Sequence, residues 1–581
     1  MSSSSHKTPA NDIVSEPASD AAPLRQGPAF EYQRDLDKVQ RKLGRQHIQM
    51  LALAGTIGTG LFLGLGQILA LCGPLGALLV YLHVASVVYA TLTSVGELTA
   101  YAPVSGTLIH YAARWFDPAL GFAMFCFSLD GYEPLYMFIT TDLLREVNRI
   151  IFMYVKFWFY LPHELISIQY AGIAVPVEVT ALSVLVAFWD KDPNHTAIYI
   201  AVTIILLIII NLFGVRFFGN SEIVFATLKI MLIIGLIIGG LVVTLGGGPN
   251  HERHGFQYWR NPGPMVSYLE PGGRGRFVGM LVALVPAAFS MSGVELIAIS
   301  AAETQNPRKN IVRAMRTVLF RILFFYITAV VIVGMLVPSN DPLLFQKASN
   351  AGQSPFVLAF TRAGIKALPS IINAVLLTSA FSAGNTLIFA SSRILYGLAV
   401  QRQAPQIFTR CTSSGVPYVA VITAGTFSVL AFLNVAGNSG TVFNWFVDLA
   451  TVGGLFGWGS INLTYLRYYY GLKLQGIVPE GIYRSSLQPF AAMWGLFWVI
   501  FYILVSGISV FWAFDASTFV ASYINIPIFF CLYFGFKIYY KTKIRTLRDL
   551  DFVTDIPKLE DTEDDVLPTK QTLMTEIRQV V

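Results

Sequence analysis

Apolar residues occur in long uninterrupted runs along most of the chain, such as Ala197 to Phe213 (AIYIAVTIILLIIINLF). A membrane-spanning helix needs about 20 consecutive apolar residues, whereas strands of a membrane barrel alternate apolar and polar positions over about 10 residues. The runs therefore predict an all-α polytopic membrane protein. Breaks at glycine, proline and charge clusters predict about twelve spans, near 48–72, 75–100, a third that ends near 189, 195–213, 222–245, 277–301, 317–337, 369–399, 418–434, 441–466, 491–513 and 518–540.

The two ends of the chain lack such runs. Residues 1–46 are rich in serine, proline and charge, which predicts a disordered tail and no cleavable signal peptide. Residues 47–540 are expected to form one transmembrane domain, and residues 541–581 a second tail.

Composition agrees with this class. Hydrophobic residues make up 54% of the chain and charged residues 13%, against about 25% charged residues in soluble domains. The net charge of +6 therefore reflects topology and not nucleic-acid binding. The four cysteines form no CxxC pair and the histidines no HExxH motif, so we expect no metal, no cofactor and no enzymatic activity.

Basic residues set the predicted orientation, because cytosolic loops are enriched in Lys and Arg. On a twelve-span topology, 21 basic residues flank one side of the spans and 8 flank the other. Both tails are therefore expected in the cytosol. The sequon Asn194-His195-Thr196 falls outside, directly beside the fourth span.

The first span contains the cluster Gly55-Thr56-Ile57-Gly58-Thr59-Gly60. Each glycine costs roughly 1 kcal/mol relative to alanine in a helix interior, so the cluster predicts local unwinding. The alternative is close packing of small residues against a neighbouring helix.

A second interruption, Phe289-Ser290-Met291-Ser292-Gly293-Val294-Glu295, occupies the corresponding place in the sixth span. Paired interruptions of this kind indicate a midplane binding site in inverted-repeat transporters. Free N–H groups at a broken helix favour an anion, and the exposed carbonyl groups favour a cation. A zwitterionic amino acid fits both requirements.

Three of the charged residues within predicted spans, where each charge costs at least about 2.5–3.5 kcal/mol at the bilayer centre, are candidates for a functional role. They are Glu178, Lys229 and Glu295. We interpret them as candidates for proton coupling, with a purely structural, hydrogen-bonded role as the alternative for each.

Further motifs follow the spans. They are Gly96-Glu97 with Pro103-Val104-Ser105-Gly106, Asp117-Pro118-Ala119-Leu120-Gly121-Phe122, Glu303-Thr304-Gln305-Asn306-Pro307-Arg308-Lys309, Val337-Pro338-Ser339-Asn340-Asp341-Pro342, Ser391-Ser392-Arg393-Ile394-Leu395-Tyr396 and Gly415-Val416-Pro417-Tyr418. Together with the glycine break they resemble fungal amino acid permeases of the amino acid-polyamine-organocation superfamily, from about 44 to 556. The segment 246–251 and Lys541-Thr542-Lys543 look most like the dicarboxylic branch of that family.

The resemblance implies a fold of two inverted five-helix repeats, with the first and sixth helices broken, plus two further helices. It implies a substrate carboxylate at Thr56, Ile57, Gly58, Thr59 and Gly60. It places the ammonium and side chain of the substrate at Phe289, Ser290, Met291, Ser292 and Gly293. Lys229 matches a lysine of proton-coupled relatives that stands where sodium-coupled relatives bind an ion. Side-chain selectivity is expected to depend on helices 1, 3, 6, 8 and 10.

One segment departs from the family pattern. Residues 124–169 form an insert with at least eight charged residues among apolar ones, and it displaces the first half of the third span. We expect either a retained intron in the gene model or an extruded segment.

The predicted function is import of amino acids, acidic or neutral, with protons across the plasma membrane. The expected partners are the amino acid, protons, the bilayer and a sorting or ubiquitin machinery acting at the cytosolic tails. The alternatives are a membrane amino acid sensor that does not transport and an inactive product of a gene model with a retained intron.

Overall fold

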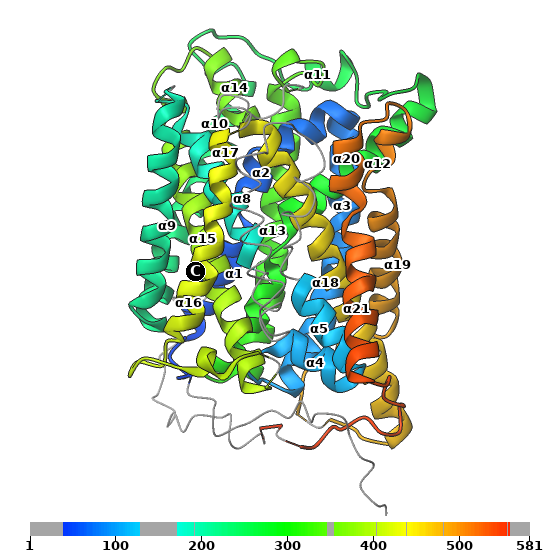
Figure 1. The fold of residues 1–581 in the computed structure, drawn as a ribbon. Coiled ribbons are helices and arrows are strands. Elements are labelled where there is room, and N and C mark those ends of the chain that lie inside the picture. Colours follow the sequence, from blue (N-terminus) through cyan, green and yellow to red (C-terminus); the bar gives the residue numbers. More distant parts are fainter. Residues whose placement is uncertain are drawn as a thin grey trace, which may run out of the picture.

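A computed structural model of the chain describes residues 39–127, 171–190, 192–344, 354–402, 404–436, 439–479, 481–554 and 556–557. Within these ranges the regular structure is helical, apart from one isolated parallel bridge between Leu43 and Thr304. The helices run side by side as one elongated bundle (Figure 1).

The first part of the bundle comprises α1 (Arg45–Thr56), α2 (Thr59–Phe62), α3 (Gly64–Tyr101), α4 (Thr107–Trp115), α5 (Pro118–Phe127), α8 (Ala171–Val186), η3 (Pro193–His195), α9 (Thr196–Leu212) and α10 (Val215–Thr244). The middle part comprises α11 (Gln257–Arg260), α12 (Gly272–Met291), η4 (Val294–Glu303), α13 (Pro307–Leu336), η5 (Pro342–Leu344), α14 (Pro355–Arg362) and α15 (Leu368–Val400). The last part comprises η7 (Gln406–Thr409), α16 (Tyr418–Phe427), η8 (Ser428–Phe432), α17 (Leu433–Ala436), α18 (Ser439–Gln475), α19 (Phe490–Val505), η9 (Ile508–Phe511), α20 (Ala516–Tyr523) and α21 (Asn525–Tyr540).

Nine helical segments of the described chain are individually long and apolar enough to cross a membrane. The other three of the twelve predicted spans fall short for different reasons. The first is divided between α1, α2 and the start of α3, and the described part of the third is only the 16-residue α8. The tenth corresponds to α18, whose polar and small residues lower its mean hydropathy. A helix packed against other helices of the bundle can carry such residues on its buried faces.

Several helices extend beyond their predicted ends. α13 begins at Pro307 and not near 317, α10 begins at Val215 and not at 222, and α18 continues to Gln475 and not to 466. Hydropathy marks only the apolar part of a helix, whereas backbone hydrogen bonding continues into the polar flanks.

The described part of the chain also reaches into the predicted N-terminal tail. Leu43 is fully buried, and its backbone N–H and C=O bond to Glu303 and Gln305 at 2.9 Å each. This short bridge ties the start of α1 to the end of η4. Residues 1–38 of the predicted tail, the part of the predicted insert after Phe127, and residues 558–581 lie outside the described residues.

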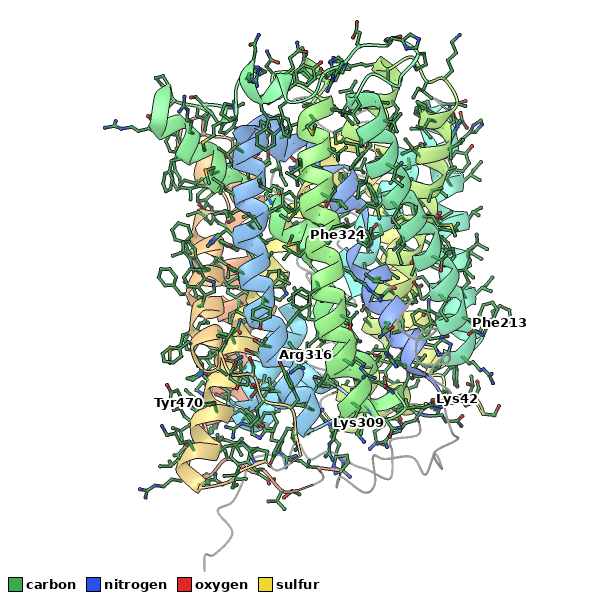
Figure 2. The ribbon with its side chains drawn as sticks, turned by 180° about the vertical axis from the view of Figure 1, so that it is seen from behind. Lys42, Phe213, Lys309, Arg316, Phe324 and Tyr470 are labelled. Carbon is green, nitrogen blue, oxygen red and sulfur yellow. The ribbon has the colours of Figure 1, made fainter. Side chains whose placement is uncertain are left out.

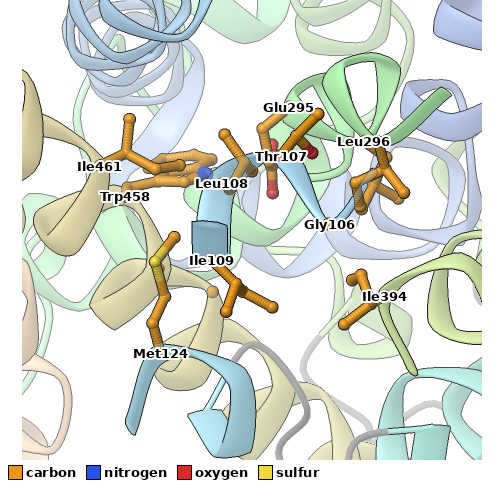
Figure 3. A pocket seen from close by; sticks show the side chains of 13 residues that line it. Gly106, Thr107, Leu108, Ile109, Met124, Glu295, Leu296, Ile394, Trp458 and Ile461 are labelled. Atoms are coloured by element: carbon orange, nitrogen blue, oxygen red, sulfur yellow. The ribbon is translucent and has the colours of Figure 1, made fainter. Parts of the chain in front are cut away.

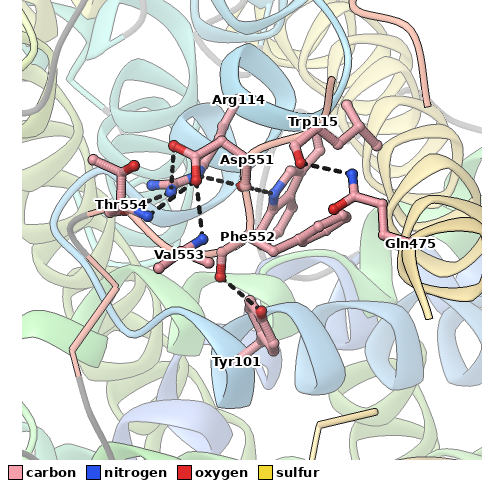
Figure 4. Close-up of polar contacts among 9 residues, drawn as sticks. Tyr101, Arg114, Trp115, Gln475, Asp551, Phe552, Val553 and Thr554 are labelled. Atoms are coloured by element: carbon pink, nitrogen blue, oxygen red, sulfur yellow. Dashed lines mark hydrogen bonds and ion pairs between the residues drawn. The ribbon is translucent and has the colours of Figure 1, made fainter. Parts of the chain in front are cut away.

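The segment that follows α21 packs against the same end of the bundle (Figure 4). Arg114 forms an ion pair with Asp551 at 3.0 Å, and the Trp115 indole N–H donates to the Asp551 carbonyl at 3.0 Å. Phe552 is buried between Tyr101, Trp115 and Tyr468. The C-terminal segment therefore connects α3, α4 and α18.

The core of the bundle surrounds the broken helices. α1 packs against α10, α13, α15 and η4, while α8 packs against α15 and α18. α3 lies against α12, α13 and α19. These contacts bring the interruption of the first span next to that of the sixth.

Candidate functional site

The first span unwinds at its glycine cluster, as predicted. α1 ends at Thr56, Ile57 and Gly58 are extended, and α2 begins at Thr59. Leu63 keeps a right-handed helical conformation between α2 and α3, so the helix effectively continues beyond Phe62. The N–H groups at the start of this half-helix have no earlier turn to bond to.

The sixth span unwinds at the matching place. α12 ends at Met291, Ser292 is extended, and Gly293 has a φ of 92°, a left-handed conformation that favours glycine. A Cβ atom on Gly293 would lie 2.7 Å from the carbonyl oxygen of Gly55. The two breaks are therefore in direct backbone contact, which requires glycine at position 293. A Cβ atom on Gly55 would lie 3.5 Å from the Gly293 carbonyl oxygen, an ordinary contact distance.

A cavity of about 110 Å³ lies between the two breaks, and we call it the central cavity. Residues of both broken helices line it, together with residues of α8, α15 and α18: Gly55, Gly58, Thr59, Gly60, Val177, Glu178, Phe289, Ser290, Ser292, Gly293, Glu295, Leu296, Ala383, Thr386, Leu387, Ala450 and Gly454. These are the five helices expected from the sequence to shape the site.

Glu178 brings an acid to the wall of the central cavity. It is 7% exposed, and the Thr59 hydroxyl lies 3.2 and 3.3 Å from its two carboxylate oxygens. A side chain at the start of the second half-helix is thereby connected to α8.

Lys229 lies behind α1 and does not line the central cavity. Its side chain is 1% exposed, and its ammonium group donates to the carbonyl of Ala54 in the last turn of α1. It interacts electrostatically with Glu222 and Glu178. The lysine thus joins α10 to the unwound end of α1.

Glu222 is a buried acid that the sequence reasoning missed. It is fully buried and accepts hydrogen bonds from Ser382 at 2.7 Å and from Asn385 at 2.6 Å. The prediction placed the helix start at 222, where a charge would be solvated. Because α10 begins seven residues earlier, Glu222 lies two turns inside the helix.

Glu295 lines two cavities at once. Besides the central cavity, it borders a second one of about 50 Å³ that extends toward the start of α4, here called the α4 cavity. Figure 3 shows its carboxylate among Thr107, Leu108 and Trp458. The carboxylate also faces the backbone N–H groups of Gly293 and of Glu295 itself, at the first turn of η4.

The remaining predicted site residues are placed differently. Ile57 is fully buried, and its carbonyl accepts from the Ser379 hydroxyl at 3.2 Å. Met291 is 1% exposed and packs into the hydrophobic core. Thr56 is the last residue of α1. Neither Ile57 nor Met291 is among the described residues that line the central cavity.

The sequence reasoning named no residue of α15 or α18 for the site. Ala383, Thr386 and Leu387 of α15 line the central cavity, as do Ala450 and Gly454 of α18. Small and apolar residues in a helix carry no chemical signal in the sequence, so only the packing of these helices identifies them.

The amino acid permease family model matches residues 47–549. The chain is 38% identical to a proline-specific permease of Emericella nidulans over 511 residues, which covers 87% of this chain and 86% of that protein. It is 34% identical to the dicarboxylic amino acid permease of Saccharomyces cerevisiae, covering 94% of this chain and 85% of that protein. It is also 34% identical to the basic amino-acid permease of the same yeast, covering 90% and 85%. These identities do not single out the dicarboxylic branch.

Proposed function

The chain belongs to the amino acid permease family, a family of multi-pass membrane transporters. From this premise we propose that it imports neutral amino acids together with protons. The two facing helix breaks around the central cavity carry the proposal. The expected inverted five-helix repeats are part of it, because such a symmetry brings two broken helices together at the midplane.

The amino acid backbone occupies the two breaks in this proposal. Its carboxylate accepts from the N–H groups at Gly58, Thr59 and Gly60, where the dipole of the half-helix favours negative charge. Its ammonium group lies against the carbonyl groups of the second break, around Phe289 to Gly293.

The lining favours a neutral side chain over an acidic one. Glu178 and Glu295 are the ionisable side chains among the described residues of the central cavity, and both are acids. A second carboxylate on the substrate would meet like charge without a cation to pair it. Val177, Phe289 and Leu387 offer apolar surface instead.

Coupling to protons is supported by Lys229. Its ammonium group donates to the end of α1 and interacts electrostatically with the acids Glu222 and Glu178, and so supplies a positive charge there. We propose that Glu178 and Glu295 are the groups that exchange the coupled proton, because both border the central cavity.

The test is uptake of labelled proline, glutamate and lysine in permease-deficient yeast that expresses the chain at the plasma membrane. We expect proline uptake that increases as the external pH falls and that is equal in sodium and choline buffers. Strict sodium dependence would contradict the proton coupling, and preferred uptake of glutamate would contradict the neutral substrate.

A fluorescent fusion in the same cells tests the proposed plasma-membrane location and cytosolic tails. It also separates transport from sensing. Surface expression without uptake of any of the three amino acids, but with a transcriptional response to one of them, would support the sensor alternative.

A further inference from the structure

An apolar groove of about 570 Å³ opens on the lipid-facing side of the bundle between α3, α13 and α19. Its volume lies within the range of about 300–1,000 Å³ typical of pockets that enclose organic ligands. Leu82, Phe320, Phe490 and Trp494 line it, and Phe320 and Phe490 are 70% and 76% exposed. Helices of this bundle therefore leave room for a chain-like apolar molecule.

The groove lies toward the end of the bundle expected in the cytosol. α19 begins at Phe490, which lines the groove, and α13 begins at Pro307, below it. Figure 2 shows Arg316 between Lys309 and Phe324 on this face of the molecule. Arg316 lies one helical turn before Phe320, so both residues share one face of α13.

A cation is fixed at this end of the groove. The Arg316 guanidinium lies over the Tyr483 ring, 4.3 Å from its centroid. Tyr483 fills the space between the two helices, because a Cβ atom on Gly96 of α3 would lie 3.4 Å from its ring and 3.5 Å from the sulfur of Met315 in α13. No carboxylate of the described chain forms an ion pair with Arg316.

We propose that this groove binds an anionic phospholipid of the cytosolic leaflet, with an acyl chain between α3, α13 and α19 and its headgroup at Arg316. The cytosolic leaflet is the one that carries anionic lipids, and a basic residue at its surface attracts them. The Tyr483 ring holds the Arg316 guanidinium in place. The N–H groups of that guanidinium are donors for a phosphate or carboxylate oxygen.

The test uses the full-length protein, delipidated in detergent and titrated with equal amounts of phosphatidylserine and phosphatidylcholine, with bound lipid counted by native mass spectrometry. Wild type should retain phosphatidylserine preferentially. Arg316→Gln should reduce that retention about fivefold, while Arg316→Lys keeps the charge and should retain part of it. Arg274→Gln removes an exposed charge at the opposite end of the bundle and should change nothing.

A second variant tests the acyl-chain half of the site. Ala491→Trp places a large side chain in the groove and should reduce retention of both lipids. Phosphatidylserine with brominated chains quenches the fluorescence of nearby tryptophans, and this quenching is compared between wild type and Trp494→Phe. The comparison does not depend on the stability of Arg316 variants. Trp494 should account for part of that quenching.

Three results would overturn the proposal. Equal retention of both lipids by wild type would mean that the groove binds acyl chains without recognising the charge of the headgroup. Unchanged retention in Arg316→Gln would exclude the headgroup contact. A dimer that forms without bound lipid and is lost in Ala491→Trp would assign the groove to a second copy of the chain.

Discussion

Lys229 illustrates how a single buried charge can hold several helices together. Its ammonium group joins the Ala54 carbonyl of α1 to the neighbourhood of Glu222 and Glu178. A buried charge remains stable only when acceptors and opposite charges replace its water. The residue is therefore a structural connection in addition to its proposed part in coupling.

Lys229→Met should abolish uptake and lower the free energy of unfolding by about 1–3 kcal/mol, because the buried Ala54 carbonyl loses its donor and Glu222 loses an interacting positive charge. Lys229→Met combined with Glu222→Gln should regain part of that stability, since the second change removes the unpaired charge. Thermal unfolding in detergent measures both effects, and Lys309→Met on the exposed face of α13 is the control. A double variant no more stable than the single one would refute the pairing.

Glu295→Gln keeps the size of the side chain but removes the carboxyl group that can bind and release a proton. If Glu295 exchanges the coupled proton, concentrative uptake should be lost while exchange of labelled for unlabelled substrate persists. The carboxylate also faces two backbone N–H groups of η4, and the Gln amide oxygen can still accept there. Accumulation driven by pH at the wild-type level would rule out the proton role, and lowered surface expression with normal pH dependence would indicate a structural role.

Gly58 and the cavity wall allow a separate test of binding. Among the described residues, a Cβ atom at Gly58 would meet Glu178 at 3.8 Å and Ala383 at 3.9 Å, so the fold tolerates a side chain there. Gly58→Val should therefore reach the cell surface but fail to bind substrate, because its branched side chain projects into the central cavity. Binding of labelled proline to surface-expressed protein measures this, and binding at the wild-type level would place the carboxylate elsewhere.

At the scale of elements, the two breaks depend on close backbone approach. A Cβ atom on Gly60 would lie 2.6 Å from the Cα atom of Ser290 and 3.0 Å from the Phe289 ring, so α2 packs against the end of α12 with no room for a side chain at position 60. A Cβ atom on Gly64, one turn later, would meet no atom of the described residues within 4 Å.

Gly60→Ala should therefore push the two half-helices apart and lower both uptake and thermal stability, by about 1–3 kcal/mol for an overpacked site. Gly64→Ala introduces the same methyl group four residues away and should be neutral or slightly stabilising, as alanine favours helix over glycine. The melting temperatures of the two variants are compared with wild type. Equal effects would show that helix propensity, and not the contact with α12, decides the result.

At the scale of the whole molecule, the C-terminal segment closes one end of the bundle. Phe552 is 4% exposed among aromatic residues of α3, α4 and α18, while the adjacent Val553 is 79% exposed. Two neighbouring residues of one segment thus have opposite environments.

Phe552→Ala should destabilise the protein by about 3–5 kcal/mol if the segment packs as a true part of the core. Val553→Ala should change the stability by less than about 0.5 kcal/mol, as expected for an exposed position. Thermal unfolding and protease sensitivity after α21 measure both. A Phe552→Ala variant as stable as wild type would mean that the segment adds no stability.

The docking of this segment should also resist mild acid. Burial alone would raise the pKa of Asp551, but the N–H groups of Thr554 and Val553 and the Arg114 guanidinium hold the pKa below its ordinary value. A lowered pKa contributes stability above the pKa of the unfolded state, about 3.9, and loses it as the pH falls through the folded value. The hydrogen-exchange protection factors of residues 545–554, which are corrected for the intrinsic exchange rate at each pH, should therefore be unchanged between pH 8 and pH 5. Release of the segment within that interval would contradict the assignment.

The sequence by itself determined the membrane class, the positions of most spans and both helix breaks. These features follow from local properties: the length of apolar runs, and glycine clusters that weaken a helix wherever they occur. Glu178, Lys229 and Glu295 were recognisable for the same reason, since a charge within an apolar run is costly in any arrangement of helices. The family resemblance added the match of Lys229 to a lysine of proton-coupled relatives.

Tertiary structure alone decided which residues meet. The contact of Gly293 with Gly55 and the lining by α15 and α18 join residues far apart in the chain. Glu222 stands at the predicted start of a span and the docked Phe552 lies beyond the last span, so hydropathy assigned both to solvent, although helix extension and packing bury them. Burial depends on what the rest of the chain places nearby, and a one-dimensional pattern of polarity does not contain that information.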